Sequence, residues 1–259
     1  MAEGFASRRK NPEKDRITQL FDIFTRSSNF PAVERELFPV SPNKGEQARR
    51  KLLLAALEKI GAKGYENASV REIAEAAGQN VAAIAYYFGT KDKLYAAVLL
   101  GIGEYLSSVF AAVAADSRRM LAEGPVDPEI GRGILKRMMR TFLGEQLGGD
   151  FEKIRLVMMR EQADPSENFD LLYRGTLGPL HELFTRAMCI ATGEDPASTE
   201  VVFRAHAIFG QVLAFKLART TLLRRLGKSQ LDAADVTSIA DILDQHVDFI
   251  CGGLKGTRP

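Results

Sequence analysis

The chain is poor in the residues that build disulfide frameworks and metal centres. Its 259 residues include two cysteines, three histidines and no tryptophan. Cys189 and Cys251 have no CxxC spacing, which argues against a disulfide-bonded scaffold and favours a reducing compartment. The histidines lie far apart in the sequence and neither cysteine has a second ligand close by, so we expect neither a metal ion nor a cofactor.

The chain also has little net charge and few long apolar runs. The formal net charge is +2, which is too small to indicate a nucleic-acid partner by itself. Residues 41–95 nevertheless carry nine Lys or Arg and six Asp or Glu, so they hold a modest positive excess. The charged stretch SRRKNPEKDR is unlike a secretory leader, and polar residues interrupt the apolar stretch from Leu94 to Ala115. We therefore expect a cytoplasmic protein that does not span a membrane.

Strand-like alternation is absent, and no Asn-Gly or Asp-Gly hairpin turn occurs. Apolar residues instead recur at helical spacing along most of the chain, which predicts an all-α fold. We expect a flexible arm over residues 1–44, a domain of short helices over residues 45–95, and a larger helical domain over residues 96–259. Within the arm, ITQLFDIF has the pattern of a short amphipathic helix.

Two C-terminal stretches carry specific predictions about helix continuity. The stretch PASTEVVFRAHAIFGQVLAFKLARTTLLRRLG is predicted as one helix. Pro179 lies inside another helical pattern, where its missing N–H and its ring should break or kink the helix.

Two short helices separated by a tight turn are predicted over residues 70–88. Ser69 and Glu72 have the Ser-x-x-Glu spacing of a capping box, which starts the first helix. Gly78 ends that helix, and Asn80 caps the second. This arrangement is typical of a helix-turn-helix, whose second helix enters the major groove of DNA.

The predicted second helix is slim and uncharged, because alanine fills several of its positions. Side chains at the start of such a helix meet base edges, where amides can bond adenine and aliphatic groups can contact a thymine methyl. Tyrosine hydroxyls, an arginine and a lysine at the next helix N-terminus can bond phosphates. A helix that only packs in a core is the alternative interpretation. The DNA-binding candidates are Arg71, Gln79, Asn80, Val81, Ala82, Tyr86, Tyr87 and Lys91.

The stretch ASVREIAEAAGQNVAAIAYYFGTKDKLYAAV resembles the DNA-binding segment of TetR/AcrR-family transcriptional regulators. The positions that fit the family pattern are Ile73, Ala74, Ala77, Gly78, Ile84, Phe88, Lys91 and Leu94. Two positions depart from it: Ala85 stands where the family usually has tyrosine, and Tyr87 where it usually has histidine. Alanine has no hydroxyl for the phosphate contact that the resemblance implies at the first position, and Tyr86 is the candidate to replace it. Together with the C-terminal GPLHELFTRAMCIATGEDP, the chain resembles the CecR-like branch over residues 44–252.

The resemblance implies a homodimer in which the last two long helices of each subunit pair in a four-helix interface. The residues agree, because small and apolar side chains recur there at helical spacing and permit close approach. An intramolecular core is the alternative reading of the same stripes. The predicted interface residues are Phe203, Ala207, Gly210, Ala214, Ile239, Leu243 and Val247.

The resemblance also implies a pocket for a small effector in the C-terminal domain. Methionine suits an adaptable apolar pocket, and polar groups within apolar runs can orient a ligand. The alternative is that these residues are ordinary core, and a satisfied core or interface histidine is the alternative at position 206. The predicted ligand-binding residues are Met138, Met158, Arg160, His181, His206 and Gln211.

The favoured hypothesis is a DNA-binding transcriptional regulator that responds to a small hydrophobic effector. We expect it to repress genes of transport or efflux from a palindromic operator, and to leave the operator when the effector binds. We find no triad-like arrangement, so we do not expect an enzyme. The alternative is a helical small-molecule carrier or enzyme with a non-functional helix-turn-helix, and an activator is a third possibility.

Overall fold

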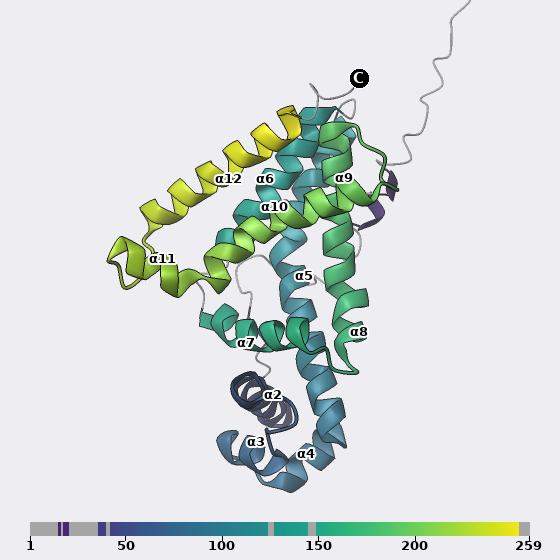
Figure 1. Ribbon diagram of the computed structural model, residues 1–259. Helices are drawn as coiled ribbons and strands as arrows, with labels where there is room; N and C mark the ends of the chain where they lie inside the picture. The colour runs from purple at the N-terminus through teal and green to yellow at the C-terminus, as the bar shows by residue number, and fades with distance from the viewer. Residues whose placement is uncertain are drawn as a thin grey trace, which may run out of the picture. The chain divides into compact units, whose positions relative to one another are not determined.

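The computed structural model describes residues 15–16, 18–20, 36–39, 42–123, 127–144 and 149–253 (Figure 1). Within these residues the regular structure is helical and no strand occurs, which confirms the all-α prediction. The helices are α2 Lys44–Lys63, α3 Val70–Ala76, α4 Val81–Phe88, α5 Lys91–Glu123, α6 Pro128–Gly144, α7 Gly149–Ala163, α8 Phe169–Leu172, the π-helix η2 Tyr173–Leu177, α9 Gly178–Thr192, α10 Thr199–Leu217, α11 Arg219–Leu226 and α12 Ala233–Gly253.

The chain packs as two compact units. Of the described residues, one unit contains 15–16, 18–20, 113–123, 127–140 and 181–253, and the other contains 36–39, 42–112, 141–144 and 149–180. The helix-turn-helix therefore belongs to the same unit as α7, α8 and the first part of α5. The domain boundary expected after residue 95 was drawn from the sequence motifs, whereas the two units are defined by packing. The expected boundary therefore stays a prediction about which part of the chain has which function.

The helix-turn-helix begins as the capping residues predict. The N–H of Glu72 donates to Ser69 Oγ at 3.2 Å, and the N–H of Ser69 donates to Glu72 Oε2 at 3.1 Å, so the capping box is complete. Hydrogen bonds from Lys63 and Ser69 lower the pKa of Glu72 from 4.5 to about 2. Because this pKa is depressed, the carboxylate stabilises the fold above pH 4.5 and that contribution is lost as the pH falls towards 2.

Replacement of Ser69 by alanine is expected to lower the free energy of unfolding by about 1 kcal/mol, because α3 loses the acceptor for its orphan amide. Urea denaturation at neutral pH measures the change. Ser69→Thr keeps the capping oxygen and is the matched control. Equal stability of the alanine and threonine variants would contradict the capping role.

The turn between α3 and α4 also follows the prediction. Gly78 has a φ of +63°, a left-handed conformation that glycine adopts without a steric penalty. Asn80 then caps α4, since its Oδ1 accepts from the N–H of Ala83 at 2.9 Å. Figure 1 shows α2, α3 and α4 gathered at the N-terminal end of α5.

A wide helical turn immediately precedes Pro179, which lies in the first turn of α9. The π-helix η2 runs from Tyr173 to Leu177 and leads directly into α9. Within it, the N–H of Gly178 donates to the carbonyl of Tyr173 five residues earlier. A π-turn inserts one extra residue, which lets the helical path continue past a residue without an N–H.

The prediction of one helix over residues 196–227 is wrong. The chain bends by 64° between α10 and α11, where Ala218 has φ −99° and ψ 20°. No glycine or proline lies at this break, so the sequence carried no local signal for it.

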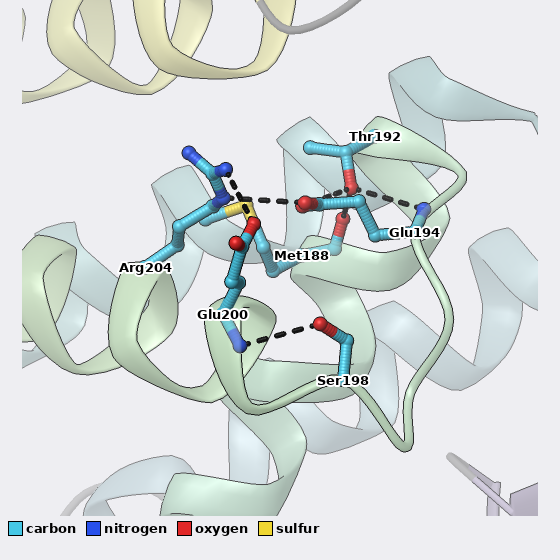
Figure 2. A network of polar contacts seen from close by, with 6 residues as sticks. All are labelled: Met188, Thr192, Glu194, Ser198, Glu200 and Arg204. Carbon is cyan, nitrogen blue, oxygen red and sulfur yellow. Dashed lines mark hydrogen bonds and ion pairs between the residues drawn. The ribbon is translucent and has the colours of Figure 1, made fainter. Parts of the chain in front are cut away.

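A polar network ties the end of α9 to the start of α10 (Figure 2). The hydroxyl of Thr192 donates to the carbonyl of Met188 at 2.9 Å and accepts from the N–H of Glu194 at 3.3 Å. The Arg204 guanidinium contacts Glu194 Oε1 at 3.2 Å and Glu200 Oε2 at 3.3 Å. These contacts stabilise the turn between the two helices, and they occupy a guanidinium that could otherwise orient a ligand.

Helix α5 contains an apolar stretch, Lys91–Met120, that is long and apolar enough to cross a membrane by length and composition. However, 61% of its apolar window is buried against other parts of the chain. Burial of this kind is typical of a core helix of a water-soluble protein, because a buried apolar surface is not available to lipid.

Candidate DNA-binding interface

Helix α4 divides into a buried and an exposed face. Ile84 and Phe88 are buried and anchor the helix against its neighbours, as predicted for the core positions. Val81, Ala82 and Tyr86 lie on the exposed face. The helix thus presents small and apolar side chains to its surroundings, and carries no charged residue of its own.

Tyr86 is the most exposed large apolar residue in the described part of the chain, with 81% of its surface accessible. Its ring meets that of Tyr87 edge to face, with centroids 4.9 Å apart. Tyr87 itself is half-buried, so it supports the neighbouring ring while Tyr86 projects outward. An exposed tyrosine supported in this way can offer its hydroxyl to a phosphate oxygen.

The two amide side chains before α4 differ in what they can offer. Asn80 Oδ1 already accepts the N–H of Ala83, so its –NH₂ group is the part left for an outside acceptor. Gln79 is half-buried, and its backbone N–H donates to the carbonyl of Ala74 at 2.9 Å. A bidentate contact with adenine needs both ends of an amide, which favours Gln79 over Asn80 for that role.

The structure places the Lys91 ammonium inside the protein's own hydrogen-bond network. Its Nζ donates to the carbonyl of Tyr65 at 2.5 Å and lies 4.3 Å from the centroid of the Tyr65 ring. The Tyr65 hydroxyl in turn donates to Asp92, and burial together with Asp92 raises the pKa of Tyr65. Lys91 therefore joins the turn after α2 to the start of α5, so a direct phosphate contact through it stays a prediction.

The helices before and after α4 each carry an exposed cation in their first turn. Arg71 is exposed on the first turn of α3. Lys93 is exposed on the first turn of α5, and its stem lies beside Gly89, which ends α4. Lys93 was not among the residues predicted to bind DNA, although its place at a helix N-terminus, two residues after Lys91, was the available signal.

Helix α7 is hydrogen-bonded to the C-terminal end of α2 through Arg160. Arg160 donates from Nε to the carbonyl of Gly61 at 2.9 Å, and from its NH2 group to the carbonyl of Ala62 at 2.8 Å. These carbonyls lie in the last turn of α2, where the helix supplies no partner for them. Arg160, predicted as a ligand contact, therefore bonds the end of a helix.

A buried carboxylate links α7 to α5 in the same unit. Glu161 is buried and accepts the Tyr95 hydroxyl at 2.5 Å. Its second oxygen accepts the N–H of Ser166 at 3.2 Å and the hydroxyl of Ser166 at 3.1 Å. Burial and the Glu161 contact raise the pKa of Tyr95, so the phenol stays protonated and keeps donating.

Comparisons with known proteins agree with this geometry. Residues 52–98 match the model of bacterial regulatory proteins of the tetR family, and residues 132–254 match that of the C-terminal domain of the HTH-type transcriptional dual regulator CecR. The HTH-type transcriptional dual regulator CecR of Shigella flexneri is 35% identical over 217 residues, which are 84% of this chain and 97% of that protein. The chain belongs to the TetR family, in its CecR branch.

Solved structures share the fold of this TetR-family protein. HlyIIR, a hemolysin II transcriptional regulator, has 22% identity and a TM-score of 0.50, covering 78% of this chain and 99% of its own. A HlyIIR mutant with a GSSGSSG linker has 22% identity and a TM-score of 0.51, covering 76% and 96%. At this level of identity the likeness concerns the fold alone.

The residues predicted to bind the effector of this TetR-family protein fall in both units. Met138 is fully buried, and His181 and His206 bond each other, with Nε2 and Nδ1 3.2 Å apart. Gln211 bonds His246 at 2.9 Å. Met158 is half-buried in the other unit, which also contains Arg160. Their role in ligand binding stays a prediction.

The residues predicted for the dimer interface separate by burial. On α10, Phe203, Ala207 and Ala214 are exposed and Gly210 is half-buried. On α12, the predicted Ile239, Leu243 and Val247 are buried within the single chain, so they have almost no surface to lose to a partner. The large apolar residues that α12 leaves exposed are Ile242 and Phe249.

Proposed function

We propose that this TetR-family protein is a homodimeric, effector-responsive regulator that binds operator DNA through α4. The observation that carries the proposal is the exposed, uncharged face of α4, with Tyr86 projecting from it and exposed cations on the neighbouring helices α3 and α5. A water-soluble protein rarely exposes such a face unless another molecule covers it. A slim helix flanked by cations fits a major groove flanked by phosphates.

Each group on this face has a role that its position supports. Gln79 and the –NH₂ group of Asn80 meet base edges, and Val81 and Ala82 contact thymine methyl groups. The remaining groups contact the backbone and set the register of the protein on DNA. These are the hydroxyls of Tyr86 and Tyr87 and the cations Arg71 and Lys93, with Lys91 holding the N-terminus of α5 in place.

Loss of the Tyr86 side chain is expected to weaken operator binding about tenfold, because the hydroxyl contact and the edge-to-face ring contact with Tyr87 disappear together. Tyr86→Phe keeps the ring and is expected to cost about threefold. Fluorescence anisotropy with labelled operator DNA measures both constants. Because Tyr86 is exposed, unfolding temperatures should not change, and undiminished binding by Tyr86→Ala would remove this residue from the interface.

Dimerisation is proposed through the exposed stripe of α10 together with Ile242 and Phe249 of α12. Small residues on α10 permit close helix approach, and the exposed aromatic side chains of Phe203 and Phe249 are large enough to fill a partner's surface. A two-fold dimer places its recognition helices in successive major grooves, about 34–36 Å apart, which calls for a palindromic operator.

The effector is proposed to be a small hydrophobic or amphipathic molecule that favours the conformation with low DNA affinity. Release from the operator then relieves repression, with transport or efflux genes as the expected targets. The relative from Shigella flexneri is named a dual regulator, which supports activation at other promoters as the second candidate function. A DNA-binding regulator acts in the cytoplasm, where its operator is.

The deciding experiment is anisotropy with DNA from the promoter region beside the protein's own gene. We expect binding that weakens steeply as salt rises, because phosphate contacts release counterions. Absent binding, or binding that does not depend on salt, would favour the alternative of a helical small-molecule carrier or enzyme. A reporter gene behind that promoter distinguishes repression from activation.

A further inference from the structure

Four residues before α2 lie across the helices that carry the recognition helix. Glu36, Leu37, Phe38 and Pro39 form this segment, which we call the strap. Leu37 is fully buried and Phe38 nearly so. These residues belong to the region expected from the sequence to be a flexible arm, but their burial places them in the core around α2 and α5.

One end of the strap is bonded to α2. Arg50 of α2 donates from Nε to the carbonyl of Phe38 at 2.5 Å. The same guanidinium lies 3.6 Å from the Glu36 carboxylate. A single arginine thus holds the strap by a backbone contact and an ion pair, and the backbone contact does not depend on which side chains the strap carries.

The other side of the strap fits into α5. The Phe38 ring lies where the side chain of residue 101 would be, since a Cβ added to Gly101 would approach Phe38 Cδ1 to 2.6 Å. Glycine costs stability inside a helix, so its presence here is explained by the ring that takes its place. A cavity of about 190 Å³ adjoins this contact, lined by the strap, α2 and α5.

The backbone of Phe38 is held in an unfavourable conformation. Its φ of 56° is the only positive value at a non-glycine residue in the described chain. Left-handed backbone at such a residue persists only when surrounding contacts impose it, and it is concentrated at functional sites. Here the imposing contacts are the Arg50 hydrogen bond and the ring on Gly101.

We propose that the strap is a brace that fixes α2 against α5, and that Phe38 is a positioning residue for operator binding. Helix α2 packs on α3, and α3 packs on α4. Two residues, Gly89 and Thr90, separate α4 from α5. The angle between α2 and α5 therefore sets the direction in which α4 projects, and the brace narrows the range of that angle. This inference rests on the proposed DNA-binding function.

The test uses Phe38→Ala, Gly101→Ala and the double variant in the full-length protein. Each single change is expected to weaken operator binding about fivefold or more, because more recognition-helix orientations must be sampled before binding. In the double variant the added methyl group meets no ring, so Gly101→Ala should cost nothing further once Phe38 is alanine. Phe38→Leu, which keeps an apolar side chain, should restore part of the affinity.

A second readout separates positioning from a loss of folded protein. Operators with one or two base pairs inserted between the half-sites are compared with the native spacing. If the strap is a brace, wild type should bind the operator with inserted base pairs much more weakly than the native operator. Phe38→Ala should reduce the ratio of these two dissociation constants at least threefold. Partial unfolding lowers the active fraction but leaves this ratio unchanged, so an unchanged ratio in both single variants overturns the proposal.

Hydrogen exchange gives an outcome that does not depend on DNA. Amides of α2 near Leu53 and of α5 near Leu100 should exchange at least fivefold faster in Phe38→Ala than in wild type, while those of α12 should not change. If wild type bound no promoter DNA, the proposed function would fail. The exchange result would still show whether the strap fixes α2 against α5. Unaltered exchange in α2 and α5 contradicts it.

Discussion

Ala82→Glu is expected to abolish specific operator binding, with a loss of at least about 100-fold, or about 2.8 kcal/mol. Ala82 is exposed on the first turn of α4, so the new side chain creates no clash inside the protein. In the proposed complex its carboxylate enters a groove bordered by phosphates and lined largely by base acceptors, where it finds repulsion and few donors. A glutamate in the first turn of a helix is favourable for the helix itself, so the fold should be retained.

Two controls separate the effect of the charge at residue 82 from the effect of side-chain size and from the effect of an added charge elsewhere. Ala82→Gln has the same shape without the charge and is expected to cost about tenfold or less, from the bulk of the side chain alone. Ala234→Glu places the same charge at an exposed position in the first turn of α12 and should leave operator affinity unchanged. Anisotropy at constant salt measures all three. Equal affinities of Ala82→Glu and Ala82→Gln would show that α4 does not enter the groove.

Gly131→Ala is expected to lower the free energy of unfolding by about 3 kcal/mol. Helix α6 approaches α9 so closely at this point that an added Cβ would lie 2.6 Å from the carbonyl oxygen of Ala187 and 2.9 Å from the Cα of Ala191. Both contacts involve backbone atoms, which cannot rotate away as a side chain can. The two helices must therefore separate, and the packing around them is lost.

Gly133→Ala on the same helix is the matched control. There the nearest atom is the terminal methyl group of Met120 at 2.9 Å, which a flexible side chain can move. The helix also gains about 0.5–1 kcal/mol when alanine replaces glycine, so this variant should stay within about 1 kcal/mol of wild type. Chemical denaturation compares the two. Similar stabilities would contradict the close approach of α6 and α9.

The capping box at Ser69, the turn at Gly78, the cap at Asn80 and the buried positions of α4 were all predictable from the sequence. They depend on interactions between residues a few positions apart, so local spacing carries the whole signal. The family followed from the same residues, because their pattern is specific to one type of helix-turn-helix.

Other features depend on partners that are distant in sequence. Lys91 was predicted to contact a phosphate, and nothing in its local sequence indicates that its ammonium also bonds the carbonyl of Tyr65, 26 residues away. Arg160 was predicted to face a ligand, but it bonds carbonyls of α2 almost 100 residues away. A charged side chain takes the unsatisfied acceptor that folding brings closest, and the sequence does not contain that distance.

By itself, the sequence determined that the chain is helical, that it carries a helix-turn-helix, and which side chains of α4 face outward. Each of these follows from helical periodicity and capping, which act within one or two turns. Only the tertiary structure decided that Phe38 lies on Gly101, that α10 and α11 are separate helices, and that α6 and α9 touch through backbone at Gly131. These outcomes depend on close packing between distant segments, where a single methyl group decides which arrangement fits.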